Sequence, residues 1–166
     1  MVLKVKIFLQ PQPLHPWGNS KALNFDWMIR LAKFLNTNKE IIAMATGKLD
    51  SLSSNEMLFI GSRTNLLAYD VENNKDIFDK EVSDGVNCLA FGTFSAVGEA
   101  LIVSGGNCSI TGFDIAADER FWTVTGDNAS SIQFMDWDDD GEEELVVGSD
   151  DFSIRVFKNE EMIFDI

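Results

Sequence analysis

The chain has 166 residues, of which 45% are apolar, and this is enough to bury the core of one ordinary domain. Its formal net charge is −14, with +5 on residues 1–49 and −19 on residues 50–166. Because an acidic surface repels phosphate groups, the charge of residues 50–166 argues against binding to nucleic acid or to anionic membranes.

Neither a membrane span nor an export signal is expected. No run of residues approaches the roughly 20 apolar positions of a transmembrane helix. The first residues lack the apolar core of a secretory signal, which favours a cytoplasmic protein. Cys88 and Cys108 stand singly among apolar neighbours. This pattern predicts free, buried thiols in a reducing compartment and argues against a disulfide.

Residues 1–40 form the least regular part of the chain. Residues 2–9 alternate between apolar and polar side chains as a strand does, and the three prolines between residues 11 and 16 then predict a loop. Residues 22–35 carry both a helical stripe and a strand-like alternation. Their place before the next apolar strand favours a strand, and the helix remains the alternative.

From residue 41 onward the chain repeats itself. A unit of two short strands begins near residues 57, 101 and 145, so that successive copies are 44 residues apart. Apolar residues keep the same register in the three copies: Tyr69, Phe113 and Phe157 in one set, and Leu66, Ile110 and Ile154 in another. A β-sandwich has no reason to keep such a fixed spacing.

Each two-strand unit is flanked by two further apolar strands. One precedes it, at residues 41–46, 86–91 and 131–135, and one follows it, at residues 76–82, 120–125 and 161–165. Four short strands in about 40–45 residues are the signature of a β-propeller blade. The continuous apolar runs at 57–60 and 145–147 predict inner strands that are buried on both faces between neighbouring blades.

The repeat therefore predicts an all-β fold, a β-propeller of four-stranded blades of which about three and a half are present. The predicted parts are a partial first blade with a Pro-rich loop (1–40) and three blades (41–85, 86–128 and 129–166). Closed propellers have roughly four to eight blades, so this one is open or partial. It belongs to a longer propeller, is closed by a partner, or pairs with a second copy as a seven-bladed ring.

An acidic loop follows the strand at residues 131–135. Asp136, Asp138 and Asp140 alternate before Gly141, whose backbone freedom suits a tight turn, and Glu144 leads into the next apolar strand. Ca²⁺ takes roughly six to eight oxygen ligands, and this loop offers several. The predicted ligands are the side chains of Asp136, Asp138, Asp140 and Glu144 and the backbone carbonyl of Glu142.

The predicted cofactor is one structural Ca²⁺, which would neutralise the carboxylates and fix the hairpin without activating water. An EF-hand shares the opening of this loop, but it requires a bidentate Glu at position twelve and a helix on each side. Position twelve here is Val147, and both flanks are apolar strands. A solvated acidic turn without metal remains the alternative.

The sequence offers no catalytic constellation. His15, the only histidine, lies in the Pro-rich loop, and no serine stands in a nucleophile elbow. Gly105–Gly106 is better explained as a hairpin turn than as a phosphate loop. The aromatic residues Phe121, Trp122, Trp137 and Phe157 are expected to pack between blades. Trp137, inside the acidic loop, is also the one candidate contact residue among them.

Several segments together resemble one family: GSRTNLLAYDV at 61–71, GGNC at 105–108, FWTVTGDN at 121–128 and VGSDDFSIRVF at 147–157. They are similar to the N-terminal β-propeller of the Bardet–Biedl syndrome protein 2 family, whose members are core subunits of the BBSome. The resemblance runs from about residue 41 to 157 and more weakly back to residue 4. The acidic hairpin of that family maps onto Asp136, Asp138, Asp140 and Gly141, with Asp139 where the family often has Gly.

The resemblance implies a protein-interaction propeller without enzymatic activity, acting in ciliary membrane-protein trafficking and ciliogenesis. Its implied partners are other BBSome subunits and ciliary membrane-protein cargo. Its implied locations are the cytoplasm, the cilium, the ciliary basal body and, peripherally, the ciliary membrane. The alternative is a calcium-dependent ligand-binding propeller similar to integrin heads. Such domains are secreted and often carry several acidic loops, whereas this chain has one, so the first interpretation leads.

Overall fold

The computed structural model describes residues 37–48, 56–94, 98–158 and 160–166. The partial blade and Pro-rich loop predicted for residues 1–40, with the undecided segment at 22–35, lie almost wholly outside these residues. Among the described residues there are twelve strands and no helix. All twelve belong to one compact unit, Lys39–Ile166.

The strands form three antiparallel sheets of four, each an up-and-down meander in chain order. The first sheet contains β1 (Ile41–Gly47), β2 (Met57–Ser62), β3 (Asn65–Asp70) and β4 (Lys75–Glu81). The second contains β5 (Cys88–Phe94), β6 (Glu99–Gly105), β7 (Ser109–Phe113) and β8 (Glu119–Val124). The third contains β9 (Ala129–Met135), β10 (Glu144–Ser149), β11 (Ile154–Lys158) and β12 (Glu161–Asp165).

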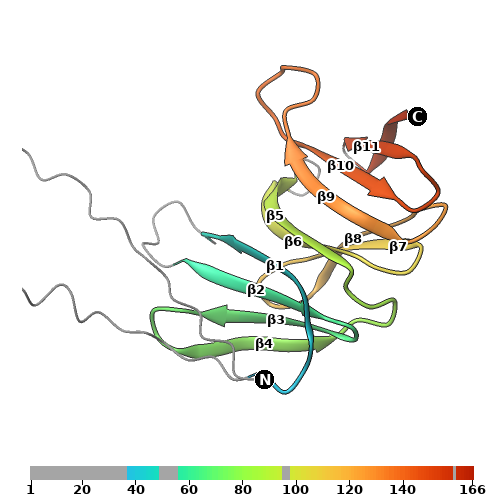
Figure 1. The fold of residues 1–166 in the computed structure, drawn as a ribbon. Coiled ribbons are helices and arrows are strands. Elements are labelled where there is room, and N and C mark those ends of the chain that lie inside the picture. The colour runs from blue at the N-terminus through green and yellow to red at the C-terminus, as the bar shows by residue number, and fades with distance from the viewer. Residues whose placement is uncertain (1–36, 49–55, 95–97, 159) are drawn as a thin grey trace, which may run out of the picture. The chain divides into compact units, whose positions relative to one another are not determined.

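The three sheets stack face to face, and their first strands lie next to one another. Strand β5 packs against both β1 and β9, and β6 also packs against β9 (Figure 1). Strands β4, β8 and β12 each form the opposite edge of their sheet. The prediction of an all-β fold built from four-stranded repeating units is therefore confirmed.

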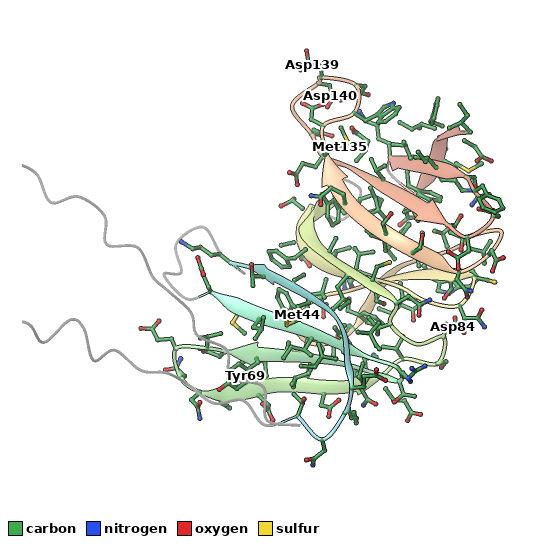
Figure 2. All side chains as sticks on the ribbon, viewed as in Figure 1. Met44, Tyr69, Asp84, Met135, Asp139 and Asp140 are labelled. Atoms are coloured by element: carbon green, nitrogen blue, oxygen red, sulfur yellow. The ribbon has the colours of Figure 1, made fainter. Side chains whose placement is uncertain are left out.

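The second strand is the most deeply buried in the first and third sheets, whereas in the second sheet it is the third strand, β7, that is buried throughout. Every residue of β2 is buried, and β10 is buried or half-buried throughout. The first strand differs, because β1 alternates along its length and exposes Ile42 and Met44 by 40% and 54% (Figure 2). Residues 57–60 and 145–147 thus lie in inner strands of their sheets, β2 and β10, as predicted, and all of them are buried except the half-buried Val146.

Two apolar clusters fill the spaces between successive sheets. One joins the first and second sheets and contains Phe59, Leu66 and Ile102. The other joins the second and third sheets and contains Phe94 and Leu145. The stacked sheets therefore share their cores, and no sheet has one of its own.

The predicted register of the repeat is present in the fold. The three aromatic residues of the first set are buried in the third strands of their sheets: Tyr69, Phe113 and Phe157. Each is paired with an aliphatic residue of the second strand: Leu58, Ile102 and Leu145. The three positions are structurally equivalent, as a series of stacked blades requires.

The pairing also shows one departure from the 44-residue period. Gly61 pairs with Leu66 and Gly105 with Ile110, but Gly148 pairs with Ile154. The second strand of the third sheet therefore follows its predecessor by 43 residues, and the turn after it holds one extra residue. The predicted 44-residue step is wrong for β10 and right for β11.

The longer turn between β10 and β11 is organised around Asp151. This carboxylate accepts hydrogen bonds from the hydroxyls of Ser149 and Ser153, and the guanidinium of Arg155 lies 2.7 Å from it. At the tip, Phe152 takes a left-handed backbone conformation (φ 66°) and is 97% exposed. Arg155, followed by the two hydroxyls, lowers the pKa of Asp151, because all three stabilise its charged form.

The free cysteines are as predicted in one respect and different in another. Neither forms a disulfide, which confirms free thiols. Cys88 is buried, and burial raises its pKa to about 11. Cys108 is only half-buried, because it lies at the tip of the β6–β7 turn in a left-handed conformation (φ 60°).

We expect Asp151→Asn to lower the melting temperature at neutral pH, because the amide loses its charged partner Arg155. The pKa of Asp151 is lower in the folded chain, so its stabilisation is complete above the ordinary aspartate pKa of about 3.9 and fades as the pH falls below it. The deficit of the variant should therefore shrink in acid. Circular dichroism melts across this range measure the effect, with Asp150→Asn as the control. A deficit that is independent of pH would contradict the assignment.

We expect Gly105→Val to destabilise the stack. A Cβ at Gly105 would lie 2.6 Å from both the Cβ of Ala129 and the Sγ of Cys88, so the second and third sheets would have to separate. Overpacking of this kind costs about 1–3 kcal/mol or more. Chemical denaturation measures the loss, and Thr93→Val, at an exposed position of β5, serves as the control. Equal stability of the two variants would show that the sheets are not closely packed at this glycine.

Candidate metal-binding loop

The acidic loop connects β9 to β10 in the third sheet. Asp139 and Asp140 lie at its tip, beyond Met135 at the end of β9 (Figure 2). Asp139 and Gly141 both take left-handed backbone conformations, with φ of 63° and 88°. Asp is one of the few residues other than Gly that tolerate this region, which explains why the loop forms with Asp139 where the family often has Gly.

Asp136 organises the backbone of the loop. Its Oδ1 accepts the N–H of Asp140 at 3.0 Å, and its Oδ2 accepts the N–H of Gly141 at 2.9 Å. Asp140 in turn accepts the N–H of Glu142 at 2.9 Å. The carboxylates therefore shape the turn directly, whatever else they bind.

Glu144 lies at the base of the loop. It is the first residue of β10, and its side chain is fully buried. Its Oε2 accepts the N–H of Trp137 at 2.8 Å, and the Trp137 ring lies 5.1 Å from that of Phe164. A buried carboxylate thus fixes the point where the chain leaves β9 and enters the loop.

The cationic partner of this carboxylate is Lys158, at the end of β11. Its Nζ lies 2.7 Å from Oδ2 of Asp138, 2.6 Å from Oδ2 of Asp140 and 3.1 Å from Oε1 of Glu144. These contacts raise the pKa of Lys158, and the hydrogen bond to Asp138 has the largest effect. The contact with Lys158 in turn lowers the pKa of Asp140.

Sequence analysis did not identify Lys158, although the repeat contains a signal for it. At intervals of 44 residues the end of the third strand carries Asp70, Asp114 and then Lys158. On the second strand, the equivalent positions hold Met57, Leu101 and then Glu144. At two neighbouring positions the third sheet therefore differs from the first two. It has a buried acid where they have an apolar residue, and a lysine where they have an aspartate.

The loop brings together three of the five predicted ligands. Oxygens of Asp136, Asp138 and Glu144 all lie within 4.8 Å of one another. Asp140 is outside this group but shares Lys158 with Asp138, and Glu142 is exposed. The donors are carboxylate oxygens, which suit a hard divalent cation. The Lys158 ammonium, however, already lies against Asp138 and Glu144 of this group and against Asp140. The metal site remains a prediction.

The aromatic residues divide as follows. Phe121 and Phe157 are buried and contribute to the cluster between the second and third sheets, which confirms their packing role. Trp122 does not pack as predicted: it is 56% exposed, because β8 is an edge strand. Trp137 is 41% exposed, so the one aromatic residue proposed as a contact is accessible.

One hollow of about 280 Å³ lies between the first and second sheets, beside Trp122. Its lining includes Ser83, Asp84 and Thr111 but neither histidine nor cysteine. Its serine therefore has no histidine in the lining to act as a general base. No helix of the described residues is long and apolar enough to cross a membrane.

Comparison with protein families gives two matches to one subunit. The N-terminal region of ciliary BBSome complex subunit 2 matches residues 18–92, and the middle region of the same subunit matches residues 131–166. Together these matches cover more than half of the chain.

Individual relatives agree with this result. The BBSome complex member BBS2 of Danio rerio is 46% identical over 132 residues, and that of Homo sapiens is 44% identical over 132 residues. Each alignment covers 80% of this chain and 18% of the relative. The Caenorhabditis elegans BBSome complex member bbs-2 is 47% identical over 107 residues, or 64% of this chain and 15% of that protein. The chain thus spans less than a fifth of the length of these relatives.

Solved structures with low sequence identity share the fold. A crystal structure of BBS1N in complex with ARL6DN has a TM-score of 0.64 at 12% identity and covers 81% of this chain and 39% of the matched chain. BamB from Moraxella catarrhalis has a TM-score of 0.58 at 16% identity, with coverage of 81% and 40%. Both are β-propeller proteins, so the predicted propeller class is confirmed.

We expect Glu144→Gln to destabilise the third sheet, whereas Glu143→Gln, one residue earlier and exposed, should have little effect. The amide keeps the shape of Glu144 but loses the charge that Lys158 requires. A lost partner for a buried, charged hydrogen-bonding group costs about 1–3 kcal/mol. Urea unfolding of both variants measures the difference. Equal stabilities would show that Glu144 does not hold the base of the loop.

Proposed function

Because the chain belongs to the BBS2 family of BBSome subunits, we propose that it forms part of a non-enzymatic propeller that binds other subunits of a BBSome-type complex. The observation that carries the proposal is the 46% identity over 80% of the chain to a BBSome complex member. The three stacked sheets supply the matching architecture. We extend the function to ciliary membrane-protein trafficking and ciliogenesis, with ciliary membrane-protein cargo as the further partner.

The geometry supports a binding role. Most of the buried side chains are apolar and lie between sheets, where they hold the stack together. The described hollow has neither a histidine nor a cysteine in its lining. The similar BBS1 propeller was solved in complex with ARL6, so a propeller of this shape in a related subunit binds another protein. By analogy, the binding surfaces of this chain are the outer faces and loops of its blades.

The proposed locations follow from the proposed partners. Membership of a ciliary complex favours the cilium and its basal body, with peripheral contact to the ciliary membrane through the complex. The net charge of −19 on residues 50–166 disfavours direct binding to anionic lipid, and it disfavours nucleic acid for the same reason. The cytoplasm is the compartment in which such a complex would assemble.

The comparisons give no support to the alternative of a calcium-dependent, integrin-like ligand-binding propeller. A cation in the acidic loop would have a structural role under the present proposal. It would neutralise carboxylates at the base of one hairpin, and it would neither bind a ligand nor activate water.

Affinity purification of the tagged full-length protein from ciliated cells tests this function. We expect other BBSome subunits to be recovered with the wild type and with Thr93→Val, and to be lost or reduced with Gly105→Val, which disturbs the packing of the second and third sheets. Quantitative mass spectrometry of the recovered proteins is the measurement. Absence of every other BBSome subunit from the wild-type sample would contradict the proposal.

A further inference from the structure

We propose that the hollow between the first and second sheets is a docking site for an arginine side chain of a partner protein. The hollow has a volume of about 280 Å³. The identity of the partner, another subunit of the complex, rests on the function proposed above. The preference for a guanidinium is argued from the described residues alone.

The hollow lies where the connector from β4 to β5 faces β7 and β8. Glu81 ends β4, and Asp84, labelled in Figure 2, belongs to the connector. Thr111 lines the hollow from β7, and Glu119 and Trp122 line it from β8. Because β8 is an edge strand, more than half of the Trp122 side chain is accessible to a partner.

The charge of the lining favours a cation. Carboxylates of Glu81, Asp84 and Glu119 are present together with a single ammonium, that of Lys80. This ammonium is already held, because it donates a hydrogen bond to the backbone carbonyl of Ala117. Neither Glu81 nor Glu119 forms an ion pair with a described residue. Two carboxylates of the lining can therefore accept a positive group from outside.

Thr111 supplies an independent observation. Its side chain is only 7% exposed, and its hydroxyl makes no hydrogen bond with any described residue. A nearly buried hydroxyl without a partner is unfavourable, and a polar group that enters the hollow would satisfy it. Its cross-strand neighbour is Trp122, whose ring face attracts a cation.

The third sheet shows which side chain fits such a place. Arg155 follows Thr111 by 44 residues and takes the equivalent position on its third strand. Thr111 pairs with Trp122 on the fourth strand, and Arg155 pairs with Asp165 in the same way. The Arg155 guanidinium lies against the connector between the second and third sheets, since a Cβ on Gly126 would be 3.3 Å from its Nη2. Two carboxylates hold it there.

The two gaps between sheets therefore differ at one equivalent position. A guanidinium of this chain fills the gap between the second and third sheets, whereas the short Thr111 leaves the hollow open between the first and second. Arginine suits this hollow better than lysine does. Its planar guanidinium stacks on an aromatic face and offers five N–H donors, whereas the lysine ammonium is compact and offers three.

NMR titration of the full chain with the peptide acetyl-GGRGG-amide tests the site. We expect the indole N–H signal of Trp122 to shift and saturate, with a dissociation constant on the order of 10⁻³ M. The same peptide with neutral citrulline in place of arginine should bind more weakly, by about threefold or more, because it forms no ion pair. Glu119→Gln should weaken binding of the arginine peptide by about threefold. Glu99→Gln, an exposed acid of β6 outside the hollow, should leave it unchanged.

Thr111→Arg copies the arrangement of the third sheet. Its guanidinium should fill the hollow from within and abolish peptide binding, whereas Thr111→Ser should bind as the wild type does. Thermal melts report whether each variant folds, and the exposed Glu119→Gln decides the question even if Thr111→Arg folds poorly. Equal affinity of the wild type for the arginine and citrulline peptides, or unchanged binding by Glu119→Gln, would overturn the arginine site.

Affinity purification of the full-length protein from ciliated cells tests the partner. We expect Thr111→Arg to recover at least one BBSome subunit less well than Thr111→Ser does, by about threefold or more. Equal recovery of every subunit by the two variants would overturn the docking role. Recovery of no subunit with the wild type would contradict the proposed function, while the peptide titration would still decide the arginine site.

Discussion

Close contact between successive sheets is the constraint on which the rest of the structure depends. A Cβ on Gly61 would lie 2.4 Å from Val86, and one on Gly105 would lie 2.6 Å from Ala129, so each sheet meets the next almost at the backbone. A single four-stranded unit cannot bury its faces alone, and stacking creates the core that it lacks. The equivalent, buried positions of Tyr69, Phe113 and Phe157 follow from this, because each stacked unit has the same neighbours.

The same contact explains the chemistry of the acidic loop. The position on the second strand that Met57 holds in the first sheet and Leu101 in the second is buried, and both residues suit it because they are apolar. Glu144 occupies it in the third sheet, and a buried carboxylate is tolerated only with a partner. Lys158 lies one strand away and supplies the charge. Once the ammonium is held there, Asp138 and Asp140 can gather around it despite their mutual repulsion.

Most of the architecture could be predicted from the sequence, because period-2 patterning and a fixed repeat are both local signals. The strand positions and the acidic loop between two strands followed from the repeat and its spacing. Lys158 did not, because it is 14 residues beyond Glu144 and becomes its neighbour only through the register of β10 and β11. Burial of the runs at 57–60 and 145–147 in inner strands was also predictable, because each run is continuously apolar.

The third sheet is where this chain departs from its own repeat. It has the acidic loop and the extra turn residue beside the exposed Phe152. It also has Glu144 where the other sheets have an apolar residue, and Lys158 where they have an aspartate. Departures from local rules concentrate at functional or strained sites, because a purely structural repeat has no reason to abandon a residue that packs well. Substituting a buried acid for Met or Leu costs desolvation that only a partner can offset. The ion pair of Glu144 with Lys158 supplies that partner, so these two residues depend on each other at this end of the third sheet.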